Sequence, residues 1–249
     1  MAQALVPLKD LVLAKSRLSG VLTRGERGLL AQAMVEDVLA VLSCHKDIVR
    51  ITLLSDDPGA TSLAQKHGAD CWTEKSLGCR GLNPLIQCAS ERLLATGEAP
   101  LIVLHGDLPL LSSEDISAVL ESQQKLNGLI VGCDTKGEGT NLLAFNAAST
   151  PAFCFGVDSC SQHVASVKSS GIPVRVMQRS GIGLDVDEAV DLRRIMEQLH
   201  LSGASSNTAQ LLYNTELGAR VTRALTSMVD GTASSSPDLF DNVNRGIAR

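Results

Sequence analysis

Short apolar runs alternate along the chain with longer stretches in which apolar residues recur every three to four positions. The runs are typical of buried strands and the longer stretches of amphipathic helices. The predicted strands are Ala4–Leu8, Ile48–Leu54, Pro100–Leu104, Leu129–Cys133, Leu142–Phe145 and Val174–Met177, with Ala69–Thr73 as an edge strand. The predicted helices begin at Thr23 and continue with Pro58–His67, Asn83–Thr96, Ser113–Lys125, Ser159–Ser169 and Asp187–Leu199. This alternation predicts an α/β fold whose parallel or mixed sheet is covered on both faces.

The last part of the chain has a different pattern. Residues 207–228 are amphipathic over their whole length and predict one helix, whereas residues 230–249 are rich in Ser, Asn, Asp and Gly, which predicts disorder. We therefore expect one main domain over residues 1–200 and a C-terminal extension over residues 201–249. This extension could pack on its own chain or in a homodimer.

Composition and charge exclude several classes of protein. The 249 residues include 22 Lys+Arg against 27 Asp+Glu, a net charge of −5, and only 2% aromatic residues. Nucleic-acid binding proteins usually carry a basic surplus or aromatic stacking platforms, so we expect no nucleic-acid partner. No apolar run is long enough to span a membrane. The 7 cysteines form no CxxC pair, which favours reduced, mostly buried thiols in a cytoplasmic protein.

Ligands of open α/β sheets bind beyond the carboxyl ends of the strands, and two acidic segments are predicted there. Asp107 follows the most apolar strand, where a carboxylate is well placed for a divalent cation such as Mg²⁺. Asp185 and Asp187 are two residues apart, so both point the same way in an extended segment. Alternatively, Asp107 belongs to a turn and Asp187 caps the helix that follows.

Two further segments have the chemistry of anion sites. The loop after the first strand carries Lys9, Lys15 and Arg17, a set of cations that suits a nucleotide triphosphate but equally a solvated surface loop. It contains neither a P-loop nor a GxGxxG motif. Glycines and hydroxyls at 137–141 and 155–159 suit a phosphate or carboxylate cradle, or simply a hairpin turn and a helix cap.

The order of these motifs resembles the CofC/FbiD family, the 2-phospholactate guanylyltransferases of coenzyme F420 biosynthesis. The resemblance covers residues 4–197. It rests on Pro7–Lys9, Ala14–Leu18, Gly81–Asn83, Gly106–Leu111, Gly139–Asn141, Phe155–Gly156 with Ser159 and His163, and Gly183–Asp187.

The resemblance implies a Rossmann-like nucleotidyltransferase fold, a three-layer sandwich of the nucleotide-diphospho-sugar transferase type with a mostly parallel sheet. The implied reaction transfers GMP from GTP to a small phosphorylated three-carbon acid and releases diphosphate. The acid is 2-phospho-L-lactate, phosphoenolpyruvate or 3-phospho-D-glycerate in this family, and of these we favour the last two. The product would pass to the transferase that attaches the deazaflavin precursor.

The resemblance also implies roles for individual residues. Lys15 and Arg17 would bind GTP and take part in catalysis, with Lys9 nearby, and Asn83 would help to hold the nucleotide. The acidic positions would bind Mg²⁺, with Asp107 also acting in catalysis; they are Asp107, Asp185 and Asp187. The residues that would hold the phospho-acid are Thr140, Gly156 and Ser159.

Two alternatives differ in their sequence requirements. A molybdenum-cofactor guanylyltransferase or a cytidylyltransferase shares the fold, but its first loop is typically rich in glycine, and residues 7–18 contain none. A non-catalytic nucleotide-binding scaffold would have lost the acidic residues, all three of which are present here. Metal-dependent GTP binding and diphosphate release separate an enzyme from such a scaffold.

Overall fold

The structure is a computed structural model that describes residues 1–8, 11, 15–95, 99–203 and 205–233. Strands within these residues form one sheet in the order β3-β2-β1-β4-β6-β5-β7. Its strands are β1 (Ala2–Pro7), β2 (Ile48–Leu54), β3 (Asp70–Trp72), β4 (Leu101–Leu104), β5 (Leu129–Cys133), β6 (Thr140–Phe145) and β7 (Val174–Met177).

The strands are parallel except β6, which runs antiparallel to both of its neighbours, β4 and β5. As a result, β6 begins at the edge of the sheet where β4 ends, and Leu142 of β6 lies opposite Leu104 of β4. The first residues of β6 therefore lie beside the loops that leave the carboxyl ends of the parallel strands. This is the edge where ligands of α/β sheets bind.

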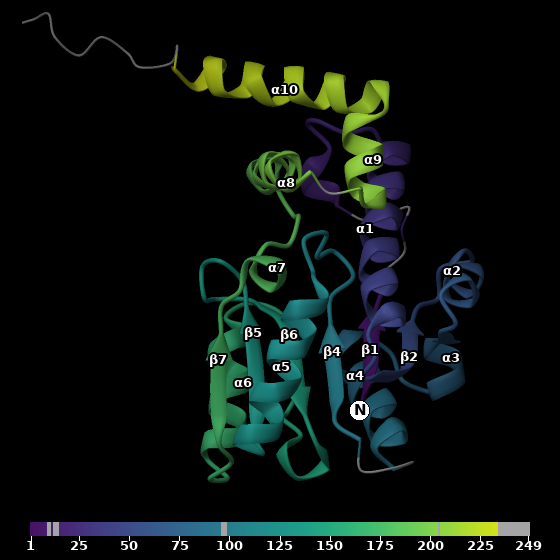
Figure 1. Ribbon diagram of the computed structural model, residues 1–249, viewed down its shortest axis with the longest axis vertical. Coiled ribbons are helices and arrows are strands. Elements are labelled where there is room, and N and C mark those ends of the chain that lie inside the picture. The colour runs from purple at the N-terminus through teal and green to yellow at the C-terminus, as the bar shows by residue number, and fades with distance from the viewer. Residues whose placement is uncertain (9–10, 12–14, 96–98, 204, 234–249) are drawn as a thin grey trace, which may run out of the picture.

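Helices cover the sheet on both faces (Figure 1). They are α1 (Arg24–Cys44), α2 (Ala60–Lys66), α3 (Glu74–Leu77), α4 (Leu82–Leu94), α5 (Ser113–Leu126), α6 (Ser159–Lys168), α7 (Ser180–Gly183), α8 (Ala189–Ser202), α9 (Asn207–Tyr213) and α10 (Glu216–Ala233), with 3-10 turns η1 (Ser16–Leu18) and η2 (Ala147–Ser149). The predicted capping box forms at the start of α1, where the Thr23 side chain accepts from the Glu26 N–H and Glu26 accepts from the Thr23 N–H.

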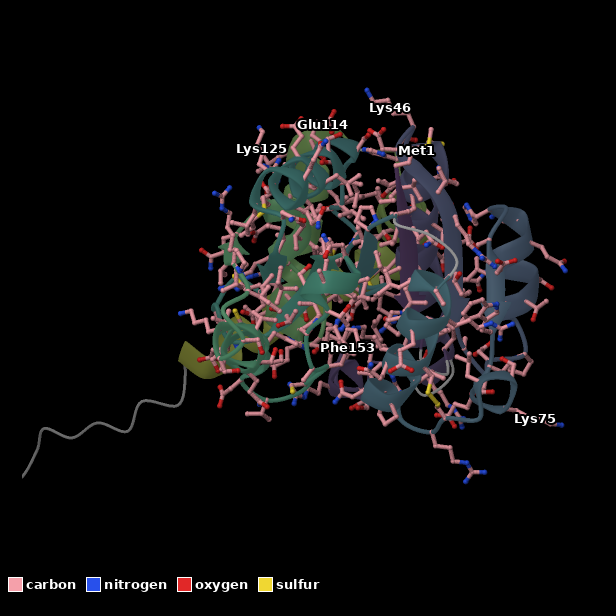
Figure 2. All side chains as sticks on the ribbon, turned by 90° about the horizontal axis from the view of Figure 1, so that it is seen from below. Met1, Lys46, Lys75, Glu114, Lys125 and Phe153 are labelled. Atoms are coloured by element: carbon pink, nitrogen blue, oxygen red, sulfur yellow. A yellow bond between two sulfur atoms is a disulfide. The ribbon has the colours of Figure 1, made fainter. Side chains whose placement is uncertain are left out.

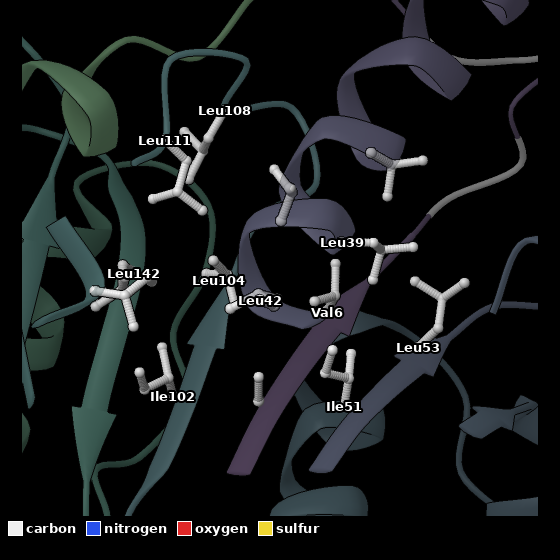
Figure 3. Packing of buried hydrophobic residues seen from close by; sticks show 14 of the residues in the cluster. Val6, Leu39, Leu42, Ile51, Leu53, Ile102, Leu104, Leu108, Leu111 and Leu142 are labelled. Carbon is white, nitrogen blue, oxygen red and sulfur yellow. The ribbon is translucent and has the colours of Figure 1, made fainter. Parts of the chain in front are cut away.

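Two hydrophobic clusters hold the layers together. Alternate residues of each strand point to opposite faces, so that Ala4 and Val6 pack under α1, α2 and α5 while Leu5 packs under α4 and α6. Figure 3 illustrates the first cluster, in which Leu39 and Leu42 of α1 lie over the strands. Burial of a strand on both faces explains why these strands are continuous apolar runs in the sequence. The predicted three-layer α/β sandwich is confirmed.

A third cluster joins the C-terminal helices to the N-terminal half of α1. Leu30 and Met34 of α1 are buried against α8, α9 and α10. At the start of α9, the buried Asp37 carboxylate accepts from the Asn207 N–H at 2.7 Å and from the Thr208 N–H at 2.9 Å. The C-terminal helices are therefore fastened to α1 by packing and by a carboxylate.

The prediction of a single helix over residues 207–228 is wrong, because the chain turns between α9 and α10 (Figure 1). At this turn Gly218 lies so close to the Leu212 carbonyl that a Cβ would approach its oxygen to 1.5 Å. The turn allows Leu212 of α9 and Val221 of α10 both to enter the third cluster. Helix α10 also continues to Ala233, into the segment expected to be disordered, and residues 234–249 lie outside the described residues.

The expectation of reduced cysteines throughout is also corrected. Cys79 and Cys88 form a disulfide between the segment before α4 and α4 itself, visible as a yellow bond in Figure 2. Of the other cysteines, Cys133 and Cys160 are buried and Cys44 is exposed. The pair escaped prediction because its two positions become neighbours only when the chain turns into α4.

No helix of the described residues is long and apolar enough to cross a membrane.

Candidate active site

Three carboxylates gather at the edge of the sheet where β4 ends. Asp107 follows β4, and Asp185 and Asp187 follow α7. One oxygen atom from each of the three lies within 4.8 Å of the others, a spacing that would allow them to share a metal ion. The two acidic segments, which the sequence analysis predicted separately, therefore form one cluster in the structure.

The Lys15 ammonium lies within this cluster. It donates to the Asp107 carboxylate and, at 2.9 Å, to Asp187 Oδ1, and its side chain is only 9% exposed. Burial alone would lower the pKa of Lys15, but the two carboxylates raise it above its usual value. Lys15 itself adopts a left-handed backbone conformation with φ 56°, which directs the chain back into the cluster. The first loop thus brings a permanent positive charge to the carboxylates.

The pKa values of Asp107 and Asp185 are shifted in opposite directions. Burial would raise the pKa of Asp107, but the positive charge of Lys15 and the neighbouring His105 ring hold it below its usual value. The pKa of Asp185 is raised, first by burial and then by the negative charges of Asp107 and Asp187. Three carboxylates around one ammonium leave an excess of negative charge, which a divalent cation would neutralise.

Asn141, which has no role among the predicted site residues, orients Asp185. Its side-chain amide donates to Asp185 Oδ1 at 3.1 Å and to the Ile182 carbonyl at 2.9 Å, and the residue is buried. Asn141 reaches this position because β6 begins at the edge of the sheet where β4 ends. Its place in the predicted Gly139–Asn141 motif was the only signal in the sequence.

The residues expected to hold the phospho-acid form a second group beside the carboxylates. Thr140 precedes Asn141 on β6, and its hydroxyl lies 3.0 Å from His163 Nδ1 in α6. Ser159 is buried at the first position of α6, and Gly156 has φ 141°, a backbone conformation that other residues rarely adopt. Thr140 and the Ser159 backbone thus contact His163, and Gly156 follows Phe155, whose ring lies against that of His163.

Asn83 supports the same group from α4. Its amide nitrogen donates to the Phe155 carbonyl at 3.2 Å, and its side-chain oxygen accepts from the Phe155 N–H at 2.8 Å. The Phe155 ring in turn contacts the rings of His105, at 5.3 Å between centroids, and His163, at 4.9 Å. The predicted contact of Asn83 with a nucleotide stays a prediction.

The remaining cations of the first loop lie further out. Arg17 is 70% exposed and its guanidinium is 3.2 Å from the Glu188 carboxylate. Lys9 lies outside the described residues. Of the predicted nucleotide-binding cations, the structure therefore places Lys15 among the carboxylates and Arg17 at their rim.

Comparison with known proteins assigns the chain to a family. Residues 2–229 match the family described as "Guanylyl transferase CofC like". This chain belongs to the CofC-like guanylyl transferase family. Members of the family are nucleotidyltransferases, and so is this protein.

Named relatives agree with the family. A phosphoenolpyruvate guanylyltransferase of Chloroflexus aggregans is 33% identical over 193 residues, which are 76% of this chain and 94% of the relative. A phosphoenolpyruvate guanylyltransferase of Conexibacter woesei is 31% identical over 211 residues, 84% of this chain and 94% of its own.

Solved structures agree in fold. A nucleotide-diphospho-sugar transferase of Desulfovibrio desulfuricans G20 superimposes with a TM-score of 0.74 at 18% identity, covering 90% of this chain and 99% of its own. A CMP:2-keto-3-deoxy-manno-octonic acid synthetase in complex with CTP superimposes with a TM-score of 0.52 at 12% identity, covering 81% of this chain and 100% of its own. The expected fold of the CofC-like family is thereby confirmed.

Proposed function

We propose that this CofC-like protein transfers GMP from GTP to the phosphate of a small three-carbon acid and releases diphosphate. The names of the relatives support phosphoenolpyruvate as the acceptor. The alternative acceptors are 3-phospho-D-glycerate and 2-phospho-L-lactate. The observation that carries the proposal is the cluster of Asp107, Asp185, Asp187 and Lys15 beside a cradle of hydroxyl and backbone groups. The product would serve coenzyme F420 biosynthesis, in which a second transferase consumes it.

The three carboxylates fit Mg²⁺. This cation prefers oxygen ligands and usually combines one or two carboxylates with phosphate oxygens of its substrate. Asp107 Oδ1 is buried and has no hydrogen-bond partner among the described residues, so one ligand atom is free to take a cation. Asp107, Asp185 and Asp187 would hold the ion, which would supply positive charge to offset the repulsion between the two anionic substrates.

The chain needs no general base for this reaction. A phosphate monoester is already anionic at neutral pH, so its oxygen can attack the α-phosphate of GTP without losing a proton to the enzyme. Catalysis then depends on bringing two anions together in line and neutralising the charge that leaves. Lys15 and Arg17 would bind the departing diphosphate, and each would first have to exchange its carboxylate partner for a phosphate oxygen.

The group around His163 would hold the acceptor. The Thr140 and Ser159 hydroxyls can donate to phosphate or carboxylate oxygens, and Gly156 leaves room for a ligand to approach the backbone. Asn83 would keep the Phe155–Gly156 segment in place by its two hydrogen bonds to Phe155. The acceptor phosphate would thus lie near the carboxylates, because Thr140 and Asn141 are the first two residues of β6, at the edge of the sheet where β4 ends.

Diphosphate release tests the proposal. The protein is incubated with GTP and Mg²⁺ together with each of the three acids separately, and with the downstream transferase present in case the product decays. We expect release that requires both Mg²⁺ and one of the acids. Binding of GTP without release in the presence of any acid would refute the proposal in favour of another acceptor or a nucleotide-binding scaffold.

A further inference from the structure

The buried ring of His163 has a defined tautomer. His163 is 0% exposed, and its Nε2 lies 3.0 Å from the backbone nitrogen of Cys154. A backbone N–H can only donate, so Nε2 is the acceptor and carries no proton. Burial lowers the pKa of His163 to about 4, and His105 adds to this effect, so the ring is neutral at pH 7. The single ring proton must therefore be on Nδ1.

This tautomer decides the direction of the next hydrogen bond. Nδ1 lies 3.0 Å from Thr140 Oγ1, and because Nδ1 carries the proton, the Thr140 oxygen accepts. The Ser159 carbonyl is a further acceptor near the ring. A hydroxyl that accepts from His163 still has its own proton to donate. That proton is suited to an anionic oxygen.

We infer that His163 is a positioning residue of the acceptor site: it fixes the Thr140 hydroxyl as a hydrogen-bond donor toward the phospho-acid. The inference rests on the proposed function, which places the acid beside Thr140. The chain of bonds runs from the Cys154 N–H through the ring to Thr140. His163 itself need not touch the substrate.

The same ring also fixes the opposite side of the acceptor site. Cys154 is followed by Phe155 and Gly156, and Asn83 binds both backbone groups of Phe155. His163 and Asn83 therefore hold the segment before Gly156 from α6 and α4, respectively. A residue with only a packing role would need neither of its ring nitrogens, whereas both nitrogens of His163 are used here.

Two substitutions of His163 each remove one of its two hydrogen bonds and keep the other. The amide of Asn lies near the position of His Nδ1, so His163→Asn can still donate to Thr140 but loses the Cys154 bond. The amide of Gln lies near the position of Nε2, so His163→Gln can still accept from Cys154 but loses the Thr140 bond. Both variants are polar and remove the same ring, so each is the control for the other. Thr140→Val removes the hydroxyl itself.

The assay measures KM for phosphoenolpyruvate, or whichever acid the wild type uses, and KM for GTP. We expect His163→Gln and Thr140→Val each to raise the KM for the acid about tenfold, the effect of one hydrogen bond to a charged ligand, with the KM for GTP within about twofold of wild type. His163→Asn should raise the KM for the acid by less, within about threefold, because the two hydrogen bonds from Asn83 still hold the Phe155 backbone when the Cys154 bond is lost. Combining His163→Gln with Thr140→Val should add little to Thr140→Val alone.

An equal rise in the KM for the acid in His163→Asn and His163→Gln would overturn the inference. So would a double variant in which the increases in KM caused by His163→Gln and Thr140→Val multiply. An independent readout does not need activity: ¹⁵N NMR of the wild-type protein labelled at histidine reports which ring nitrogen of His163 carries the proton. A signal for protonated Nδ1 that shifts in Thr140→Val is expected, and protonated Nε2 would contradict the inference. Failure of the proposed function would instead appear as a wild type that uses none of the acids.

Discussion

The bond between Asp37 and α9 offers a direct test of how the C-terminal helices are attached. Asp37 is 8% exposed on α1, and one of its carboxylate oxygens accepts from the backbone and side chain of Asn207 while the other accepts from the Thr208 N–H. Asp37→Asn keeps the size of the side chain. It replaces one acceptor oxygen by an NH₂ group, so that a donor faces a donor at one of the two positions.

The magnitude follows from these contacts. A hydrogen bond to a charged group contributes roughly 1.5–3 kcal/mol, and leaving a buried donor unpaired costs a similar amount. We expect Asp37→Asn to lower the free energy of unfolding by about 2–3 kcal/mol, which for a protein of this size lowers Tm by roughly 4–12 °C. The control is Glu121→Gln, which removes a charge from an exposed i,i+4 pair with Lys125 and should change stability by less than about 0.5 kcal/mol.

Urea unfolding followed by circular dichroism measures both variants, and hydrogen exchange at Asn207 and Thr208 localises the effect. If α9 is fastened to the domain by Asp37, these two amides exchange faster in Asp37→Asn than in the wild type. Stability equal to that of Glu121→Gln, with unchanged exchange at both amides, would refute the view that residues 207–233 are an integral part of the fold.

Three further predictions concern the site. Asp107→Asn should reduce turnover at least about 10²-fold with Tm unchanged within a few degrees, because it removes a partly buried charge that would hold the cation; turnover within a few-fold of wild type would contradict this. Asn141→Leu should weaken Mn²⁺ binding, measured by electron paramagnetic resonance, by about tenfold or more, since Asp185 loses its orienting donor, and equal affinity would contradict that role. For His163, the pKa of about 4 in the folded protein lies below the usual 6.5, so the unfolded chain binds the proton more readily between these values and stability is lost as the pH falls through that window. In urea unfolding, the loss of stability from pH 7 to pH 5 should be about 2 kcal/mol larger in the wild type than in His163→Phe; the same loss in both proteins would exclude His163 as a source.

The order of strands and helices was predictable because burial on both faces of the sheet leaves a continuous apolar run in the sequence. Ile48–Leu54, Leu129–Cys133 and Val174–Met177 match β2, β5 and β7 at both ends. The antiparallel direction of β6 was not predictable, since hydrophobic periodicity carries no information on strand direction. The break between α9 and α10 was not predicted because the amphipathic spacing of apolar residues continues across Asn214 and Thr215. Only the close approach of Gly218 to the Leu212 carbonyl in the structure reveals the turn.

The site was predictable in its residues more than in its contacts. The three aspartates could be grouped because the loops that leave the carboxyl ends of parallel strands meet at one edge of the sheet. The position of Lys15 between Asp107 and Asp187 depends on the left-handed backbone of a non-glycine residue, which the sequence does not indicate. The bonds from Asn141 to Asp185 and from His163 to Thr140 join residues distant in the sequence, so their roles required the folded arrangement.

The central claim is that GMP is joined to the phosphate oxygen of a three-carbon acid. The most direct measurement is ³¹P NMR of a reaction containing GTP, Mg²⁺, phosphoenolpyruvate and catalytic amounts of the protein, with 3-phospho-D-glycerate and 2-phospho-L-lactate in parallel samples. We predict free diphosphate together with two mutually coupled phosphorus signals from a new diphosphate bond between guanosine and one acid. GTP that stays intact with all three acids, or that yields diphosphate and free GMP with no coupled pair from its first time points, would contradict the account.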